Sequence, residues 1–126
     1  MVLGLLWCST AFAEDLTGTQ VLCKHKAWNE KTIPNIPNKW MYRGLKFLSE
    51  KSVERYDFYK FEISISKRGY SVKPHAIVTG LWRLNRETLE LRAYYCEILD
   101  KGTNVYTELK KISERAVKKQ KEKNKI

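Results

Sequence analysis

The sequence of 126 residues has few of the residue types on which most catalytic and metal sites depend. It contains only two histidines, His25 and His75, and three cysteines. It has no G-x-S-x-G elbow, no phosphate-binding glycine loop and no H-E-x-x-H motif, the signatures of several hydrolase and nucleotide-binding classes. Because no group of residues with defined catalytic roles is visible, the sequence predicts a protein that is not an enzyme, with no catalytic residues and no cofactor.

Long hydrophobic runs are also missing. The apolar stretch at residues 2–7 is far shorter than the roughly 20 residues that a membrane-spanning helix needs. It fits the hydrophobic region of a secretory signal, and Ala11-Phe12-Ala13 offers the small residues that signal peptidase accepts. We therefore expect residues 1–13 to be a signal peptide cleaved after Ala13, and the mature chain to be exported to the periplasm or the extracellular space.

The expected signal lacks one usual feature, a positively charged start. No Lys or Arg precedes Lys24, so either the natural start lies upstream of Met1 or the free amino group supplies the charge. The alternative is that residues 1–13 form a buried strand or a short anchor.

Cleavage would leave two cysteines, Cys23 and Cys96. In an oxidising compartment an even count predicts a disulfide, which would stabilise the fold by about 4 kcal/mol in the chain-entropy model. The alternative is a zinc site with His25 and His75, since Cys23 and His25 share a face if they lie on a strand. We expect the disulfide and no metal, because export favours oxidation.

Acidic residues are scarce relative to basic ones, 14 against 24, which gives a net charge of +10. Residues 108–126 hold eight basic residues and three glutamates, half of that net charge. This segment would contact an anionic membrane, lipopolysaccharide or an acidic protein, or simply keep the terminus soluble. The residues expected to make such a contact are Lys110, Lys111, Lys118, Lys119 and Lys121.

Short strands are expected from residue 16 to residue 99. The clearest pattern is the alternation of apolar and polar residues from Tyr59 to Ser66, typical of a half-buried strand. Residues 25–39 contain Pro34 and Pro37 and are expected to form a long loop. The other expected strands cover 16–24, 40–48, 53–58, 70–73, 76–84 and 88–99, with turns at 49–52, 67–69 and 85–87.

The spacing of the apolar residues changes from that of strands to that of a helix after Gly102. Val105, Leu109, Ile112 and Ala116 recur at helical spacing, and Asn104 is a good helix cap. We expect a helix docked over Val105–Val117 and fraying beyond. The fold class is thus mainly β, a small antiparallel meander barrel or strongly curved sheet at 14–104, followed by a C-terminal basic α-helix and frayed tail at 105–126.

Leu16-Thr17-Gly18-Thr19 at the first strand, the long loop at residues 25–39 and the closing helix together resemble the lipocalin-like, or calycin, β-barrels. Gln20 stands where that family has a Trp. The stretch from Trp82 to Leu89 also resembles small uncharacterised secreted proteins of bacteria. The barrel resemblance implies that Cys23 and Cys96 lie at the closing seam between the first and last strands.

The same resemblance implies a small apolar ligand inside the barrel. Its implied contacts are Trp28 and Trp40 at the lid, with Phe61, Ile63, Trp82 and Tyr95 inside. The alternative for these residues is ordinary core packing. The resulting interpretation is a secreted or periplasmic, non-enzymatic binding protein. The alternative function is an envelope-associated protein that contacts anionic lipid, lipopolysaccharide or an acidic protein through its basic surface and C-terminal helix.

Aromatic residues interleaved with basic ones also suggest a nucleic-acid surface. Examples are residues 40–43, residues 56–60 and the basic turn expected at 67–70. Aromatic residues are common in strands for packing reasons, and export separates the chain from most nucleic acids. We therefore expect no nucleic-acid partner, and the sequence leaves the oligomeric state open.

Overall fold

The computed structural model describes residues 15–26, 41–59 and 62–123. It contains nine antiparallel strands in one sheet and one C-terminal helix, α2 (Val105–Lys123). The strands are β1 (Gln20–His25), β2 (Tyr42–Phe47), β3 (Ser52–Tyr59), β4 (Glu62–Gly69), β5 (Ser71–Val72), β6 (Ala76–Thr79), β7 (Trp82–Asn85), β8 (Glu90–Leu91) and β9 (Tyr94–Ile98).

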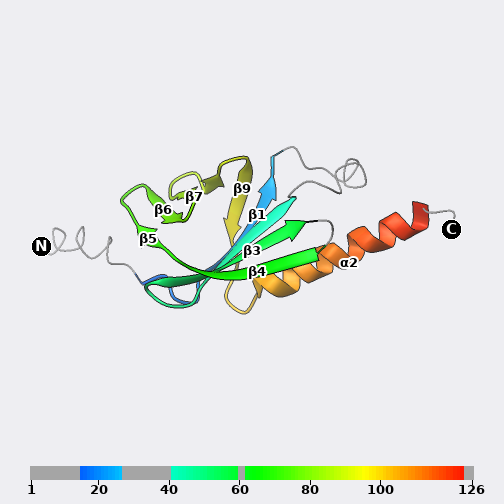
Figure 1. The fold of residues 1–126 in the computed structure, drawn as a ribbon, viewed down its shortest axis with the longest axis horizontal. Coiled ribbons are helices and arrows are strands. Elements are labelled where there is room, and N and C mark those ends of the chain that lie inside the picture. Colours follow the sequence, from blue (N-terminus) through cyan, green and yellow to red (C-terminus); the bar gives the residue numbers. More distant parts are fainter. Residues whose placement is uncertain (1–14, 27–40, 60–61, 124–126) are drawn as a thin grey trace, which may run out of the picture.

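Nearly every strand pairs with its neighbours in the chain, in the order β4-β3-β2-β1-β9-β8-β7-β6-β5. The first and last strands, β1 and β9, pair in the middle of this order. Only Tyr70 separates β4 from β5, so the two free edges of the sheet belong to one bent stretch of chain (Figure 1). The result is a nearly closed, barrel-like sheet with a helix, which confirms the expected fold class.

The sheet has two faces with separate cores. The interior face gathers side chains from both halves of the sheet: Val21, Cys23, Leu45, Phe47, Val53, Ile77, Trp82, Leu84, Leu91 and Tyr94. The outer face is covered by α2 and holds Met41, Tyr42, Tyr56 and Phe58 against Val105 and Leu109. Side chains along a strand alternate between the faces, so residue parity decides which core each one joins.

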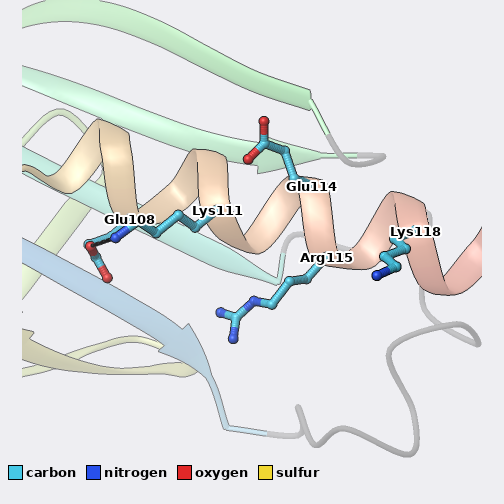
Figure 2. A pocket seen from close by; sticks show the side chains of 5 residues that line it. All are labelled: Glu108, Lys111, Glu114, Arg115 and Lys118. Atoms are coloured by element: carbon cyan, nitrogen blue, oxygen red, sulfur yellow. Dashed lines mark hydrogen bonds and ion pairs between the residues drawn. The ribbon is translucent and has the colours of Figure 1, made fainter.

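Helix α2 packs through the apolar stripe expected from the sequence. Val105 and Leu109 are fully buried, and Ala116 is 4% exposed. Gly44 allows this close approach, because a Cβ there would lie 2.7 Å from a methyl carbon of Val105. Polar side chains such as Lys111 and Arg115 project from the other sides of the helix (Figure 2).

The start of α2 is capped twice. The Asn104 side chain accepts a hydrogen bond from Thr107 N at 3.1 Å, as expected. The Gln20 side chain accepts one from Val105 N at 2.8 Å and donates one to the Thr103 carbonyl at 3.0 Å. One β1 side chain therefore anchors the helix to the sheet. The helix also runs to Lys123 instead of fraying after Val117, since Lys, Glu and Gln are good helix formers.

Several expected strand boundaries are wrong. Residues 59–66 are not one strand, because β3 ends at Tyr59 and β4 begins at Glu62. The turn expected at 67–69 is the end of β4, and the strand expected at 76–84 is the β6–β7 hairpin, whose turn contains Gly80 at a φ of +62°. The strand expected at 88–99 is divided into β8 and β9, next to Arg92 at a φ of +55°. Apolar alternation continued across these turns and concealed them.

Candidate anion-binding site

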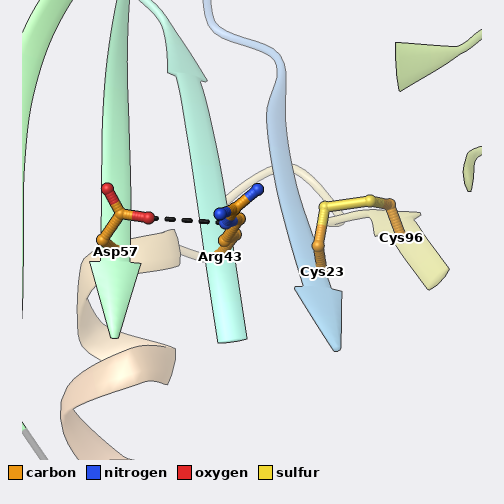
Figure 3. The surroundings of a disulfide bond; sticks show 4 residues. All are labelled: Cys23, Arg43, Asp57 and Cys96. Atoms are coloured by element: carbon orange, nitrogen blue, oxygen red, sulfur yellow. Dashed lines mark ion pairs between the residues drawn. A yellow bond between two sulfur atoms is a disulfide. The ribbon is translucent and has the colours of Figure 1, made fainter. Parts of the chain in front are cut away.

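The interior face carries charged residues on β2 and β3, at the end of the sheet where β2 begins and β3 ends. Arg43 on β2 and Asp57 on β3 are direct partners in the strand register. Their side chains form an ion pair with 3.5 Å between Arg43 Nε and Asp57 Oδ1 (Figure 3). Arg55, two residues before Asp57, points to the same face because of strand alternation. These positions put three ionised side chains inside the curved sheet.

Both arginines stack on one tryptophan. The Cζ atoms of Arg55 and Arg43 lie 4.0 Å and 4.5 Å from the ring centroid of Trp82. Arg43 also lies 4.7 Å from the centroid of Tyr94. Trp82 is only 4% exposed, so the guanidinium groups and the surrounding core shield its indole from water. Cation–π contacts of this kind hold a guanidinium plane in a fixed orientation.

The two arginines keep buried N–H groups that make no hydrogen bond. In the described part of the chain, the Nε atoms of Arg43 and Arg55 are buried and make no hydrogen bond, and neither does the Thr79 hydroxyl. Arg55 Nη1 donates only a long bond, 3.4 Å, to the Thr79 carbonyl. A buried donor without a partner destabilises the fold by about 1–3 kcal/mol. An acceptor brought by a ligand would remove that cost.

The local charge is positive. Arg68 on β4 acts electrostatically on both Asp57 and Arg55, so three cations face one carboxylate. Burial raises the pKa of Asp57 above its ordinary value, although Arg43, Arg55 and Arg68 pull it down. Burial likewise lowers the pKa of Arg55, while its guanidinium stays charged. We call Arg43, Arg55, Arg68 and Asp57 around Trp82 the arginine cluster.

The arginine cluster can be reached from solvent. The Arg43 and Asp57 side chains are 18% and 23% exposed, and Arg68 is exposed. The β3–β4 register sets Ser64 opposite Asp57 and Ser66 opposite Arg55, which adds two hydroxyl groups to this side of the site. The arrangement offers oriented N–H and O–H donors and a net positive charge, the chemistry that binds a carboxylate or a phosphate.

A disulfide holds the strands beside the cluster. Cys23 on β1 and Cys96 on β9 are register partners joined at an S–S distance of 2.00 Å. This confirms the disulfide expected from the sequence and its place between the first and last strands. Cys23 also pairs in register with Arg43, and Figure 3 shows the four side chains across neighbouring strands. The bonded sulfurs are not available as zinc ligands, and His75 pairs instead with Glu87.

Of the six residues expected to contact an apolar ligand, the structure describes Ile63, Trp82 and Tyr95, and it does not bring these three together. Trp82 lies inside, but as the stacking surface of the two arginines. Ile63 lies on the outer face, packed against the core under α2, and Tyr95 is 58% exposed beside Lys26. The expectation that Ile63 and Tyr95 point inside is therefore wrong, because alternation assigns the interior to Tyr94. Trp28, Trp40 and Phe61 lie outside the described residues.

Hollows also occur elsewhere on the sheet. An apolar cavity of about 170 Å³ lies at the opposite end of the interior face, lined by residues that include Val21, Phe47 and Leu84. An open groove of about 610 Å³ runs along the β6–β8 strands beside Val78, Arg83 and Arg92. The first is partly enclosed but small, and the second is larger and more open. Neither includes the two stacked arginines among its lining residues.

The basic residues expected to meet an anionic surface are all exposed on α2: Lys110, Lys111, Lys118, Lys119 and Lys121. Lys111 pairs with Glu108 at 3.5 Å, and a shallow groove follows the helix beside Arg115 and Lys118 (Figure 2). They form a second cationic region on the outer face, separated from the arginine cluster by the sheet.

Sequence reasoning missed the arginine cluster as a site. It noted the segments holding Arg43, Asp57 and Arg68 only as mixed aromatic and basic stretches, because a charged residue within a strand usually faces water.

In the described residues, no group of three or more His, Cys, Asp and Glu could hold a metal ion, and no helix is long and apolar enough to cross a membrane. Comparison with protein families, curated proteins and solved structures gives no match.

Proposed function

We propose that this chain is a non-enzymatic binding protein that takes a small ligand with an oxyanion, a carboxylate or a phosphate, at the arginine cluster. One observation carries the proposal: two arginines stack on a single buried tryptophan while their buried Nε–H groups make no hydrogen bond, although Arg43 Nε lies 3.5 Å from Asp57. Export of the mature chain after cleavage behind Ala13 is part of the proposal. The disulfide is compatible with it.

Stacking matters because it fixes the guanidinium planes before a ligand arrives. A guanidinium held flat against an aromatic ring still presents its N–H edge, which matches the two oxygens of a carboxylate or phosphate. A hydrogen bond to a charged group contributes about 1.5–3 kcal/mol. Asp57 neutralises only part of the positive charge, so the cluster still favours an anion.

The volume of the apolar cavity beside Val21 and Phe47 does not favour a large apolar ligand. Ordinary small-molecule pockets enclose about 300–1,000 Å³, whereas this partly enclosed cavity measures about 170 Å³. That volume holds a molecule the size of benzene. Recognition of a larger ligand therefore rests on the charged end of the interior face.

The proposal is tested by calorimetric titration of the disulfide-bonded protein with three probes: sodium hexanoate, hexanol and inorganic phosphate. We expect saturable binding of hexanoate, phosphate or both, and none of hexanol, because only the anions can accept hydrogen bonds from Arg43 and Arg55. Binding of hexanol as tight as that of hexanoate would contradict the proposal, and so would no binding of any probe.

Matched variants then locate the site. Arg55→Gln removes the charge next to Trp82, and we expect affinity to fall at least about tenfold, the loss of one charged hydrogen bond. Arg83→Gln removes an equal charge from an exposed position on β7 and should leave affinity within about twofold. Equal losses in the two variants would show that only the net charge matters.

Contact of α2 with an anionic surface is a second candidate function. It is favoured by the exposed lysines and by the end of α2, which extends beyond the strands (Figure 1). Each base near an anionic membrane contributes about 1 kcal/mol. Reversing Lys118, Lys119 and Lys121 to Glu should therefore weaken sedimentation with phosphatidylglycerol vesicles more than tenfold. Reversing the exposed Lys51, Lys73 and Lys101 is the control, and equal effects would refute a role for the helix.

A further inference from the structure

Strand β4 presents a long free edge. All eight residues of β4 pair with β3 on one side, and no strand of the described chain pairs with its other side. Proteins usually protect such an edge with proline, a bulge or a central charge. The middle of β4, from Ile63 to Ser66, has none of these, and Ile65 is 49% exposed.

This edge is complementary to itself. If two copies of β4 pair antiparallel about a twofold axis at Ile65, Glu62 of each copy lies opposite Arg68 of the other. Ser64 then faces Ser66, and Ile65 faces its own copy. Partners in this register have the same parity, so side chains meet on the same face of the joined sheet. Opposite charges facing each other across strands contribute about 0.2–1 kcal/mol per pair.

Neighbouring registers lose this match. Moving the axis to Ser64 sets Glu62 opposite Ser66, and moving it to Ser66 sets Arg68 opposite Ser64. Both shifts separate Glu62 from Arg68 and so lose the charge pair. Lys67 faces an isoleucine with the axis at Ile65, where it meets Ile63, as well as with the axis at Ser66. Only the register centred on Ile65 forms two opposite-charge pairs and buries the exposed isoleucine.

We propose that two copies of this protein associate through antiparallel β4–β4 pairing centred on Ile65. The interface is isologous and forms a closed dimer. It does not rest on the function proposed for the arginine cluster, although Arg68 belongs to both. A single added strand pair buries little area, so the dimer is weak and reversible. The charge of +10 on each copy opposes association. Because exposed ion pairs contribute little, screening of that repulsion dominates and moderate salt strengthens the dimer.

Sedimentation velocity of the full, disulfide-bonded protein over a range of concentrations tests the proposal. We expect a reversible monomer–dimer equilibrium. Glu62→Arg or Arg68→Glu alone turns two attractive pairs into two repulsive ones and should weaken the dimer about tenfold. The double variant Glu62→Arg with Arg68→Glu restores opposite charges and should return the dissociation constant to within about threefold of the parent.

Two controls keep the result specific. Glu97→Arg changes the same charge at an exposed position of β9 and should leave the dimer within about twofold of the parent. Ile65→Lys places two ammonium groups face to face and should abolish association while circular dichroism remains native. A parent that is monomeric at all concentrations would overturn the proposal. A dimer that tolerates both single reversals would also overturn it.

Discussion

The two faces of the sheet meet the same packing problem with different chemistry. Under α2, the outer core is made of apolar and tyrosine side chains, and the backbone of the helix start is capped by Asn104 and Gln20. On the interior face, an apolar end adjoins the arginine cluster, where buried N–H groups make no hydrogen bond in the described chain. The backbone groups at the helix start are hydrogen-bonded on the outer face, whereas buried N–H groups on the interior face make no hydrogen bond.

This difference separates stability from recognition. Satisfied polar groups and close apolar packing stabilise the fold, whereas unsatisfied buried donors destabilise it unless a ligand pairs with them. Variants on the outer face should therefore change the free energy of unfolding without changing affinity. Variants in the arginine cluster should do the reverse.

The largest effect is expected from the disulfide between β1 and β9, whose cysteines lie on the interior face. Replacing Cys23 and Cys96 together with Ala should lower the free energy of unfolding by about 4 kcal/mol, because the bond closes a loop of 73 residues' separation. Urea denaturation monitored by circular dichroism measures the change. Ser71→Ala, at an exposed position outside the bond, is the control. A loss below about 1 kcal/mol would show that the β1–β9 hydrogen bonds alone fix this pairing.

Leu109→Ala tests the outer face by itself. Leu109 is fully buried between α2 and the sheet, and its truncation should lower the free energy of unfolding by about 3 kcal/mol. Affinity for hexanoate should stay within about twofold of the parent. Lys110→Ala, on the exposed side of the same turn, should change stability by less than about 0.5 kcal/mol. A large loss of affinity in Leu109→Ala would break the division between the faces.

The double variant Arg43→Met with Asp57→Leu tests the interior face. Replacing a partly buried ion pair with apolar residues of similar volume is often neutral or stabilising, so stability should change by less than about 1 kcal/mol. Affinity for hexanoate should fall more than tenfold. Chemical denaturation and calorimetry on the same sample measure both quantities. A loss of stability equal to that of Leu109→Ala would show that the charges of Arg43 and Asp57 stabilise the fold.

The smallest effect concerns pH. Because burial raises the pKa of Asp57 in the folded state, the folded protein binds the proton more tightly than the unfolded chain. This contribution to stability is complete below the ordinary pKa of 3.8 and is lost as pH rises through the folded value. Asp57→Asn lacks it, so the stability of the parent relative to Asp57→Asn should decrease as pH rises across this range. Denaturation curves at several pH values measure it, and an increase would contradict the assigned direction.

Local patterns predicted the fold class, the disulfide, the helix and its Asn104 cap. These depend on periods of two or 3.6 residues, on cysteine count and on capping chemistry, all of which act over short stretches of chain. The β3–β4 hairpin was missed because apolar alternation runs through it. The continuation of β4 to Gly69 was missed because Lys67-Arg68-Gly69 has the composition of a turn.

The arginine cluster needed three-dimensional information. Arg43, Arg55 and Trp82 come from strands far apart in the sequence, and their contact depends on how the sheet curls. One part was within reach: if Cys96 faces Cys23 inside the sheet, alternation places Tyr94 inside and Tyr95 outside. The cysteine pair therefore predicts that Tyr94, and not Tyr95, lies inside the sheet.

The pairing of β1 with β9, together with the bond from Gln20 to Val105, also bears on the kinetics of folding. β1 pairs with β2 on one side, but on its other side it pairs with β9, which lies more than seventy positions later in the chain. A growing polypeptide cannot complete its central ladder until nearly all of it has been made. The topology thus has a high contact order, which slows folding and leaves the edge of β1 uncovered until the end of synthesis.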